Sequence, residues 1–113
     1  MTSLSKAVEI ADRLTAAGID ATCDPRGANP PCVLLTPPNG LVDHLCGATG
    51  SWALFALSPT TANIDAWQAL DEMLAAIESV LSIEGWDFVA YSLSPDNPPL
   101  PAYRIRYTEA FEL

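Results

Sequence analysis

The residues that could carry out chemistry in this chain are few and scattered. The single histidine, His44, lies beside Asp43, and no spacing singles out a serine as its partner in a nucleophilic pair. This pattern favours a surface or interface role for His44 over a role as general base. No glycine-rich motif of the GxGxxG or GxxxxGK[ST] type occurs. We therefore expect no enzyme activity and no cofactor.

The three cysteines do not define a metal site or a disulfide framework. Cys23, Cys32 and Cys46 form no CxxC pair, and one histidine cannot complete a zinc set. An odd number excludes complete pairing, although Cys23 and Cys32 flank a turn and could face each other across a hairpin. Small buried thiols, as in reduced intracellular proteins, fit the spacing better.

Two further groups of charged residues remain. Asp71 and Glu72 lie on a predicted helix, where they are expected to face solvent. Arg104 and Arg106 are two apart on a predicted strand and therefore share one face. They could pair with an acid on a neighbouring strand, such as Asp87 or Glu112, or they could contact another subunit.

The composition limits the class of protein. The chain has 113 residues and a formal net charge of −9, with fourteen acids against five bases. This charge argues against wrapping nucleic acid and favours solubility or a surface that repels DNA. Half of the residues are hydrophobic, yet no stretch reaches the roughly 20 apolar residues of a membrane span, and the start lacks the apolar core of a signal peptide. The excess apolar surface predicts self-association or a protein partner.

Hydrophobic periodicity predicts one domain over 1–113 with two amphipathic helices and several strands. The helices are expected at 3–17 and 63–82, and the strands at 19–23, 32–36, 51–58, 86–94 and 102–113. In the first helix the predicted buried stripe is Leu4, Val8, Ala11 and Leu14, with Ser3 or Ser5 as the cap and Gly18 after its end. In the second helix the stripe is Trp67, Leu70, Leu74, Ile77 and Leu81, with Asn63 or Thr61 as the cap, acids Asp65 and Glu72 opposite, and Asp71 and Glu78 beside it.

The segment 37–50 is predicted to be a long loop. It contains Leu41, Val42 and Leu45, which a fully solvated loop would not favour. Two interpretations follow, a protein-contact loop or a loop folded back on the core. With the contact interpretation, Leu41, Val42, His44 and Leu45 join Arg104 and Arg106 as candidate interface residues.

The order of elements, α-β-β-β-α-β-β, predicts an α+β fold. We expect a mixed, mostly antiparallel sheet of four to five strands to carry both helices. The strand at 51–58 is apolar on both faces, which predicts a central position. In the last strand, Tyr103, Ile105 and Tyr107 alternate with Arg104, Arg106 and Thr108, and Glu109 interrupts the apolar series.

Four stretches together resemble a known family of structural proteins. They are the first helix ending in "AAGI", the proline-framed "PPCVLLTPP", the strand and helix of "SWALFALSPTTANIDAWQALDEMLAAIESVL", and "GWDFVAYSLSPDNPPLPAYRIRYTEAFEL". Over residues 3–113 the chain is similar to the tail terminator, or tail completion, proteins of long non-contractile-tailed bacteriophages of actinobacteria. The segment 39–50 matches none of these phrases.

The resemblance implies a homohexameric ring on the head-proximal end of the tail tube. Such a ring ends tube polymerisation and provides a docking surface for the head-side connector. The implied partners are further copies of the chain, the tail-tube protein and the head-side connector or head-closure protein, while DNA passes through the bore without specific binding. The implied location is the neck of the virion, after assembly in the cytoplasm of the host bacterium, with no catalysis, no cofactor and no membrane.

Two alternatives remain open at this point. One is another neck or minor tail protein, such as a head-closure protein, which would bind portal-side adaptors instead of tubes. The other is an acidic protein-binding module, which would form a tight one-to-one complex with a basic target and no ring.

Overall fold

The computed structural model describes residues 2–42 and 47–112. The elements in chain order are α1 (Ser3–Ala16), β1 (Ala21–Thr22), the short 3-10 helix η1 (Pro25–Gly27), β2 (Cys32–Leu35), β3 (Asn39–Val42), β4 (Gly47–Leu57), α2 (Asn63–Glu78), β5 (Gly85–Tyr91) and β6 (Leu100–Glu112). Both predicted helices and all five predicted strands are present, and β3 is an additional strand.

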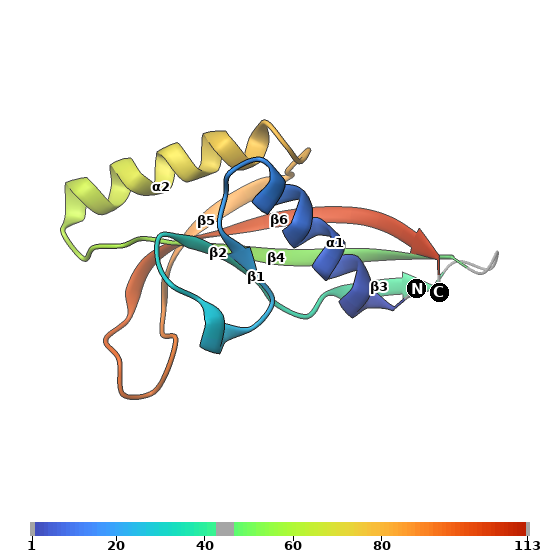
Figure 1. The fold of residues 1–113 in the computed structure, drawn as a ribbon, viewed down its shortest axis with the longest axis horizontal. Helices are drawn as coiled ribbons and strands as arrows, with labels where there is room; N and C mark the ends of the chain where they lie inside the picture. The colour runs from blue at the N-terminus through green and yellow to red at the C-terminus, as the bar shows by residue number, and fades with distance from the viewer. Residues whose placement is uncertain (1, 43–46, 113) are drawn as a thin grey trace.

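The sheet is mixed and has the order β1-β2-β4-β6-β5, with β3 also paired to β4. Among the described strands, β1 and β2 form the single parallel pair, and the other four pairs are antiparallel. The predicted α+β class is therefore confirmed, and β4 is central as expected. Figure 1 shows β4 and β6 running along the length of the molecule, with α2 toward one end of the sheet and β3 at the other.

The two faces of the sheet differ in character because side chains alternate along β4 and β6. Trp52 and Leu54 of β4 lie beside Tyr107 and Ile105 of β6, all buried in one cluster with both helices. At one end the opposite face holds a second, smaller buried cluster of Cys32, Leu34, Leu57 and Ala102, with Phe55 packed against it. The exposed remainder of this face, which carries Arg104 and Arg106, is called here the open face. The period-two pattern predicted for the last strand is confirmed.

Helix α1 begins and ends where the sequence indicates, with two corrections. Thr2 is the N-cap, and Ser5 completes a capping box with it, so neither Ser3 nor Ser5 is the cap itself. The buried residues are Ala7, Ile10, Ala11 and Leu14, whereas Leu4 and Val8 are exposed. The buried stripe is thus rotated from the predicted one, because Ile10 and Leu14 are the residues that reach the sheet. Gly18 has a φ of 88°, as its predicted position after the helix requires.

Helix α2 buries Ala66, Leu70 and Ile77 against the sheet. The prediction that Trp67 belongs to the buried stripe is wrong, since 61% of this residue is exposed. The predicted caps are also wrong: the N-cap is Ala62, without a side-chain hydrogen bond. Instead, the Ala62 N–H donates to Thr60 Oγ1 at 3.1 Å, so the preceding turn supplies the local order.

The segment 37–50 is not a continuous loop. Strand β3 pairs antiparallel with the first part of β4, from Asn39 opposite Ser51 to Val42 opposite Ala48. The small residues at the start of β4 are of types that are common in turns. Gly50, however, is required by the packing of the Trp52 ring. A Cβ at Gly50 would lie 2.5 Å from the ring of Trp52, so only glycine leaves room for that ring.

Glu109 ties β6 to α1. It follows Tyr107 on the helix-covered side of the sheet, where it would be poorly solvated. Lys6 lies 2.8 Å from Glu109 Oε2, Arg13 donates to both carboxylate oxygens at 3.0 and 2.8 Å, and the Tyr107 hydroxyl donates at 2.8 Å. Burial alone would raise the pKa of Glu109, but the bonds from Lys6, Tyr107 and Arg13 outweigh it and lower the pKa.

We expect Glu109→Gln to lower the free energy of unfolding by about 1–2 kcal/mol, because it weakens charge-assisted hydrogen bonds. A carboxyl with a lowered folded pKa stabilises the protein above its ordinary pKa of about 4.3 and loses this contribution as the pH falls through the lowered value. Urea unfolding at several pH values measures the effect. The variant should lose less stability than the wild type on acidification; equal losses would contradict the role of Glu109.

Candidate interaction site

Arg104 and Arg106 lie side by side on the open face, and both bind the same acid. Arg104 Nη2 is 3.0 Å and Arg106 Nη1 is 3.1 Å from Asp87 Oδ2 on β5. Gly85 lies opposite Arg106, and the Arg106 guanidinium lies over the space that a side chain at position 85 would occupy. The predicted cross-strand pair with Asp87 is confirmed, and the predicted contact with another subunit stays a prediction.

The ion pairs leave most of the binding capacity of the arginines unused. All three side chains are about half exposed, so the pairs contribute under about 1 kcal/mol each. Each guanidinium has five N–H donors, and only one bond from each reaches Asp87. The group of three carries a net charge of +1 on an acidic protein.

The predicted contact residues of 37–50 are placed only in part. Leu41 and Val42 lie on β3, with exposed fractions of 78% and 75%. Leu41 pairs with Thr49 and therefore shares the open face with the arginines, whereas Val42 faces the helix side. His44 and Leu45 lie outside the described residues, as does Cys46. Leu41 and Val42 are thus presented to solvent by an ordered strand, not folded back on the core.

A groove runs between α2 and β5 on the helix side, at the end of the sheet away from β3. Its volume is about 360 Å³, and its walls include the aromatic residues Trp67, Trp86, Phe88 and Tyr103. Trp86 and Phe88 are 52% and 68% exposed. Exposed aromatic residues gathered in a groove are typical of protein contact sites. We call this site the aromatic groove.

The aromatic groove exists because α2 packs over β4 and β6 and leaves β5 uncovered. Trp86 and Phe88 point to the helix side, opposite Ile105 and Tyr103, and both side chains stay largely exposed there. The sequence did not reveal this site, since Trp67 has helical spacing suited to a core. The alternation of Trp86 and Phe88 with Asp87 is the only local signal, and it does not show whether that face is covered.

Tyr103, which lines the aromatic groove, is also hydrogen-bonded to α2. The Tyr103 hydroxyl donates to Asp71 Oδ1 at 2.7 Å, so the prediction that Asp71 only faces solvent is incomplete. Burial and the bond to Asp71 raise the pKa of Tyr103 to about 12. Asp71 thereby anchors α2 to β6, and its side chain remains exposed.

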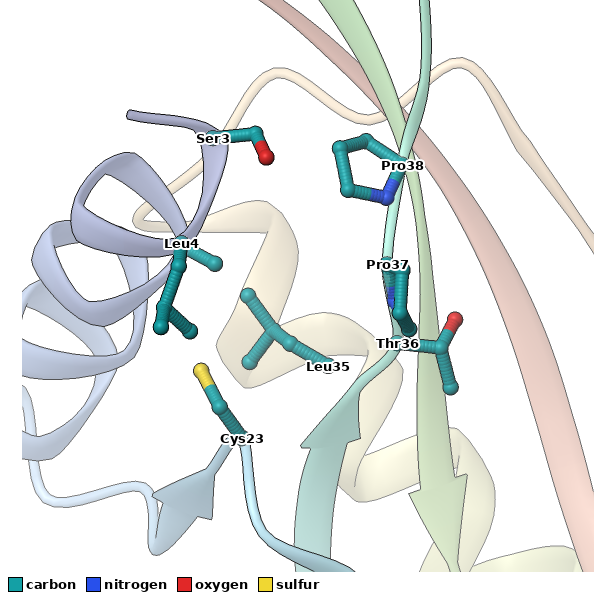
Figure 2. A pocket seen from close by; sticks show the side chains of 8 residues that line it. Ser3, Leu4, Cys23, Leu35, Thr36, Pro37 and Pro38 are labelled. Atoms are coloured by element: carbon teal, nitrogen blue, oxygen red, sulfur yellow. The ribbon is translucent and has the colours of Figure 1, made fainter. Parts of the chain in front are cut away.

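A smaller pocket of about 110 Å³ lies between α1 and the segment after β2. Figure 2 shows the Cys23 side chain pointing into it beside Leu4 and Leu35. Burial, and then the charge of Asp12, raise the pKa of the Cys23 thiol, which keeps it protonated and weakly nucleophilic. Cys23 and Cys32 are both free. Across residues 2–42 and 47–112, no group of three or more His, Cys, Asp or Glu side chains could hold a metal ion.

Comparison with known proteins identifies no family: no protein-family model matches the chain, and no curated protein matches it. In the part of the chain that the structure describes, neither helix is long and apolar enough to cross a membrane.

We expect Tyr103→Phe to cost about 1 kcal/mol of stability, because Asp71 loses its donor. The raised folded pKa means that the phenol stabilises the protein fully below pH 10 and loses this contribution as the pH rises toward about 12. Phenolate absorbance during an alkaline titration should lose its latest component in the variant. Tyr91→Phe is the matched control, and a titration in which both variants lose the same component would contradict the assignment.

Proposed function

We propose that this protein is a structural component of a bacteriophage neck, a tail terminator that forms a ring at the head-proximal end of the tail tube. The ring would end tube polymerisation and provide the docking surface for the head-side connector. The proposal starts from the resemblance of the sequence to that family. The observation that carries it furthest is the pair of unlike surfaces on opposite faces of the sheet.

One of these surfaces is the open face, with Arg104, Arg106 and the exposed Leu41. The other is the outer side of α2, where Asp65 and Glu72 are seven residues apart and both exposed. A basic and apolar face on one subunit suits an acidic face on the next. Because the two surfaces differ, the contact is head to tail, and such contacts close into rings when the rotation permits.

The proposed role requires no catalysis. The acidic composition of the protein suits a ring through which DNA passes. A bore lined by acids would let DNA slide without adhering, since phosphates are repelled. The proposed location is the virion neck, and assembly would take place in the host cytoplasm. An electrostatic map of the assembled ring checks this arrangement, and a basic bore would count against it.

The assembly itself is tested first. Native mass spectrometry and negative-stain microscopy of the concentrated protein, with and without tail-tube protein, should give six-fold rings or capped tubes. A protein that stays monomeric and does not bind tail tubes would contradict the proposal. Binding to a head-side protein without any effect on tubes would favour the head-closure alternative.

The contact surface is tested by charge. We expect the double variant Arg104→Gln, Arg106→Gln to lose rings while its monomer stays folded, because exposed ion pairs contribute little stability. Asp87→Asn removes the same ion pairs but keeps both arginines, so it should still form rings. If the wild type and both variants assemble equally well, the arginines have no role between subunits and only form the ion pairs with Asp87.

The apolar part of the surface has its own control. Leu41→Ser should weaken assembly by about tenfold, because an exposed leucine is expected to be buried between subunits. Leu4→Ser removes an exposed leucine on α1, away from the open face, and should leave assembly unchanged. Sedimentation over a concentration series measures both. An equal effect of the two changes would indicate general solubility instead of a defined contact.

A further inference from the structure

Strand β5 forms an edge of the sheet. It pairs with β6 on one side, and none of the strands at 2–42 and 47–112 pairs with its other side. Alternate backbone N–H and C=O groups along this seven-residue strand are therefore open to a further strand. Lysine, proline or very short length often protects an edge strand from such pairing, and β5 has none of these three features.

The side chains of β5 form two rows because they alternate between the faces of the sheet. The row on the helix side contains Trp86, Phe88 and Ala90. Its two aromatic residues stay 52% and 68% exposed, since α2 packs mainly over β4 and β6. The opposite row contains Asp87, the only charged residue of the strand, and both arginines of β6 already bind it. The edge is therefore apolar on the helix side and has no charge that lacks a partner.

The sequence of β5 is complementary to itself when two copies run antiparallel. If Phe88 lies opposite Phe88 of a second copy, all seven residues of the strand have a partner. Trp86 of each copy then lies opposite Ala90 of the other, so a large side chain meets a small one. The ends of the strand follow the same rule, since Gly85 lies opposite Tyr91. Directly opposite side chains are the pairs that stabilise a sheet.

The charge of β5 favours this register as well. Asp87 of each copy lies opposite Val89 of the other, so no carboxylate faces a carboxylate. Moving the second copy by two residues in one direction would place Asp87 opposite Asp87, which is destabilising. Moving it by two residues in the other direction would leave Trp86 without a partner in β5.

The same arrangement covers the aromatic groove. Residues directly opposite each other in an antiparallel pair share a face, so both α2 helices lie on one side of the joined sheet. With strands about 4.8 Å apart, the two helices are roughly 14–19 Å apart, against about 8–10 Å for helices in direct contact. The space between them is that of two aromatic grooves, and it contains Trp67, Trp86 and Phe88 of each copy.

We propose that two copies of the chain join through β5 as a two-fold symmetric dimer, with Phe88 opposite Phe88. The dimer continues the sheet from one copy into the other and buries the aromatic groove. The contact is isologous, because each copy contributes the same surface. It differs from the head-to-tail contact of the proposed ring, goes beyond that proposal and does not rest on it.

The size of this surface predicts a weak dimer. Trp67, Trp86 and Phe88 are 61%, 52% and 68% exposed. They supply roughly 350 Å² per copy, because a buried aromatic side chain covers about 150–250 Å². The backbone edge adds to this area, and specific interfaces begin at about 600 Å² per partner. We therefore expect a dissociation constant in the micromolar range.

Other strands of the chain fit this edge less well. Strand β3 directs Leu41 and Val42 to opposite faces, so it offers one apolar side chain to the aromatic groove. Strand β1 has two residues. Strand β6 already has β4 on one side and β5 on the other. A second β5 supplies both the backbone edge and the apolar row.

Sedimentation of the full chain over a concentration series tests the dimer. We expect a monomer–dimer equilibrium that shifts toward dimer as salt rises from about 0.05 to 0.5 M, because salt screens the repulsion between two chains of charge −9. Leu41→Ser, which should weaken the proposed ring, should dimerise like the wild type. A wild type that stays monomeric up to about 1 mM overturns the proposal.

A charge on the edge should prevent the pairing. Phe88→Lys places two lysines opposite each other and should weaken the dimer at least about tenfold. Its monomer should stay folded, since Phe88 is 68% exposed. Leu4→Lys is the matched control: it adds the same charge at a residue that is 65% exposed on α1, and it should leave the dimer unchanged. Equal effects of the two changes would show that net charge, and not the edge, controls association.

Disulfide trapping tests the register. The two Cβ atoms at position 88 should lie about 4.5–5.5 Å apart, close to the separation that a disulfide requires. The two Cβ atoms at position 90 should be four residues apart along the strands, or about 13 Å. Under mild oxidation, Phe88→Cys should therefore cross-link at least about tenfold faster than Ala90→Cys, with the wild type as the background for its own thiols. Equal rates for the two variants overturn the proposed pairing.

The dimer and the ring can fail separately. If rings form and the species below them is only the monomer, the dimer is overturned and the proposed function stands. If the dimer forms with the expected register and no ring appears with tail-tube protein, the dimer stands and the proposed function fails.

Discussion

The pairing of β4 with β6 is the interaction on which the rest of the structure depends. The two strands match from Gly47 opposite Glu112 to Leu57 opposite Ala102. Strands β2 and β3 attach to the free edge of β4, and β5 attaches to β6. Both helices lie over the face that this pair builds, where the Trp52 side chain fills the space that Gly50 leaves. A shift of one residue in this register would exchange the buried aromatic face with the arginine face.

The chain uses its few cations to hold specific elements together. Lys6 and Arg13 join α1 to β6 through Glu109, and the two arginines of β6 join it to β5 through Asp87. Little positive charge is left for α2, whose acids face solvent on both sides of the helix. As a result the two sides of the sheet differ in charge: the open face is mildly basic, and the helix side is acidic.

The sequence was most informative where pattern and burial agree. The alternation in β6 predicted both of its faces. Of the two acids named as candidate partners of the arginines, Asp87 and Glu112, the structure pairs them with Asp87. Strand β3 was not predictable, because Leu41 and Val42 are both exposed and its partner begins with small residues that suggest a turn. Trp67 was misplaced for a related reason: helical periodicity identifies an apolar stripe but does not reveal where the sheet beneath it ends. The aromatic groove depends on that lateral offset, which only the assembled fold defines.

The link between α1 and β6 also bears on how the chain can fold during synthesis. Arg13 and Glu109 are 96 positions apart in the sequence. Helix α1 is therefore made long before the residue of β6 that it binds. Until β6 exists, β4 has an open edge and the apolar side of α1 has only part of its packing surface. The native structure that depends on β6 can therefore form only after the last strand has been made. Folding should be dominated by distant contacts and correspondingly slow, which leaves the unpaired β4 edge exposed to chaperones or to other nascent copies.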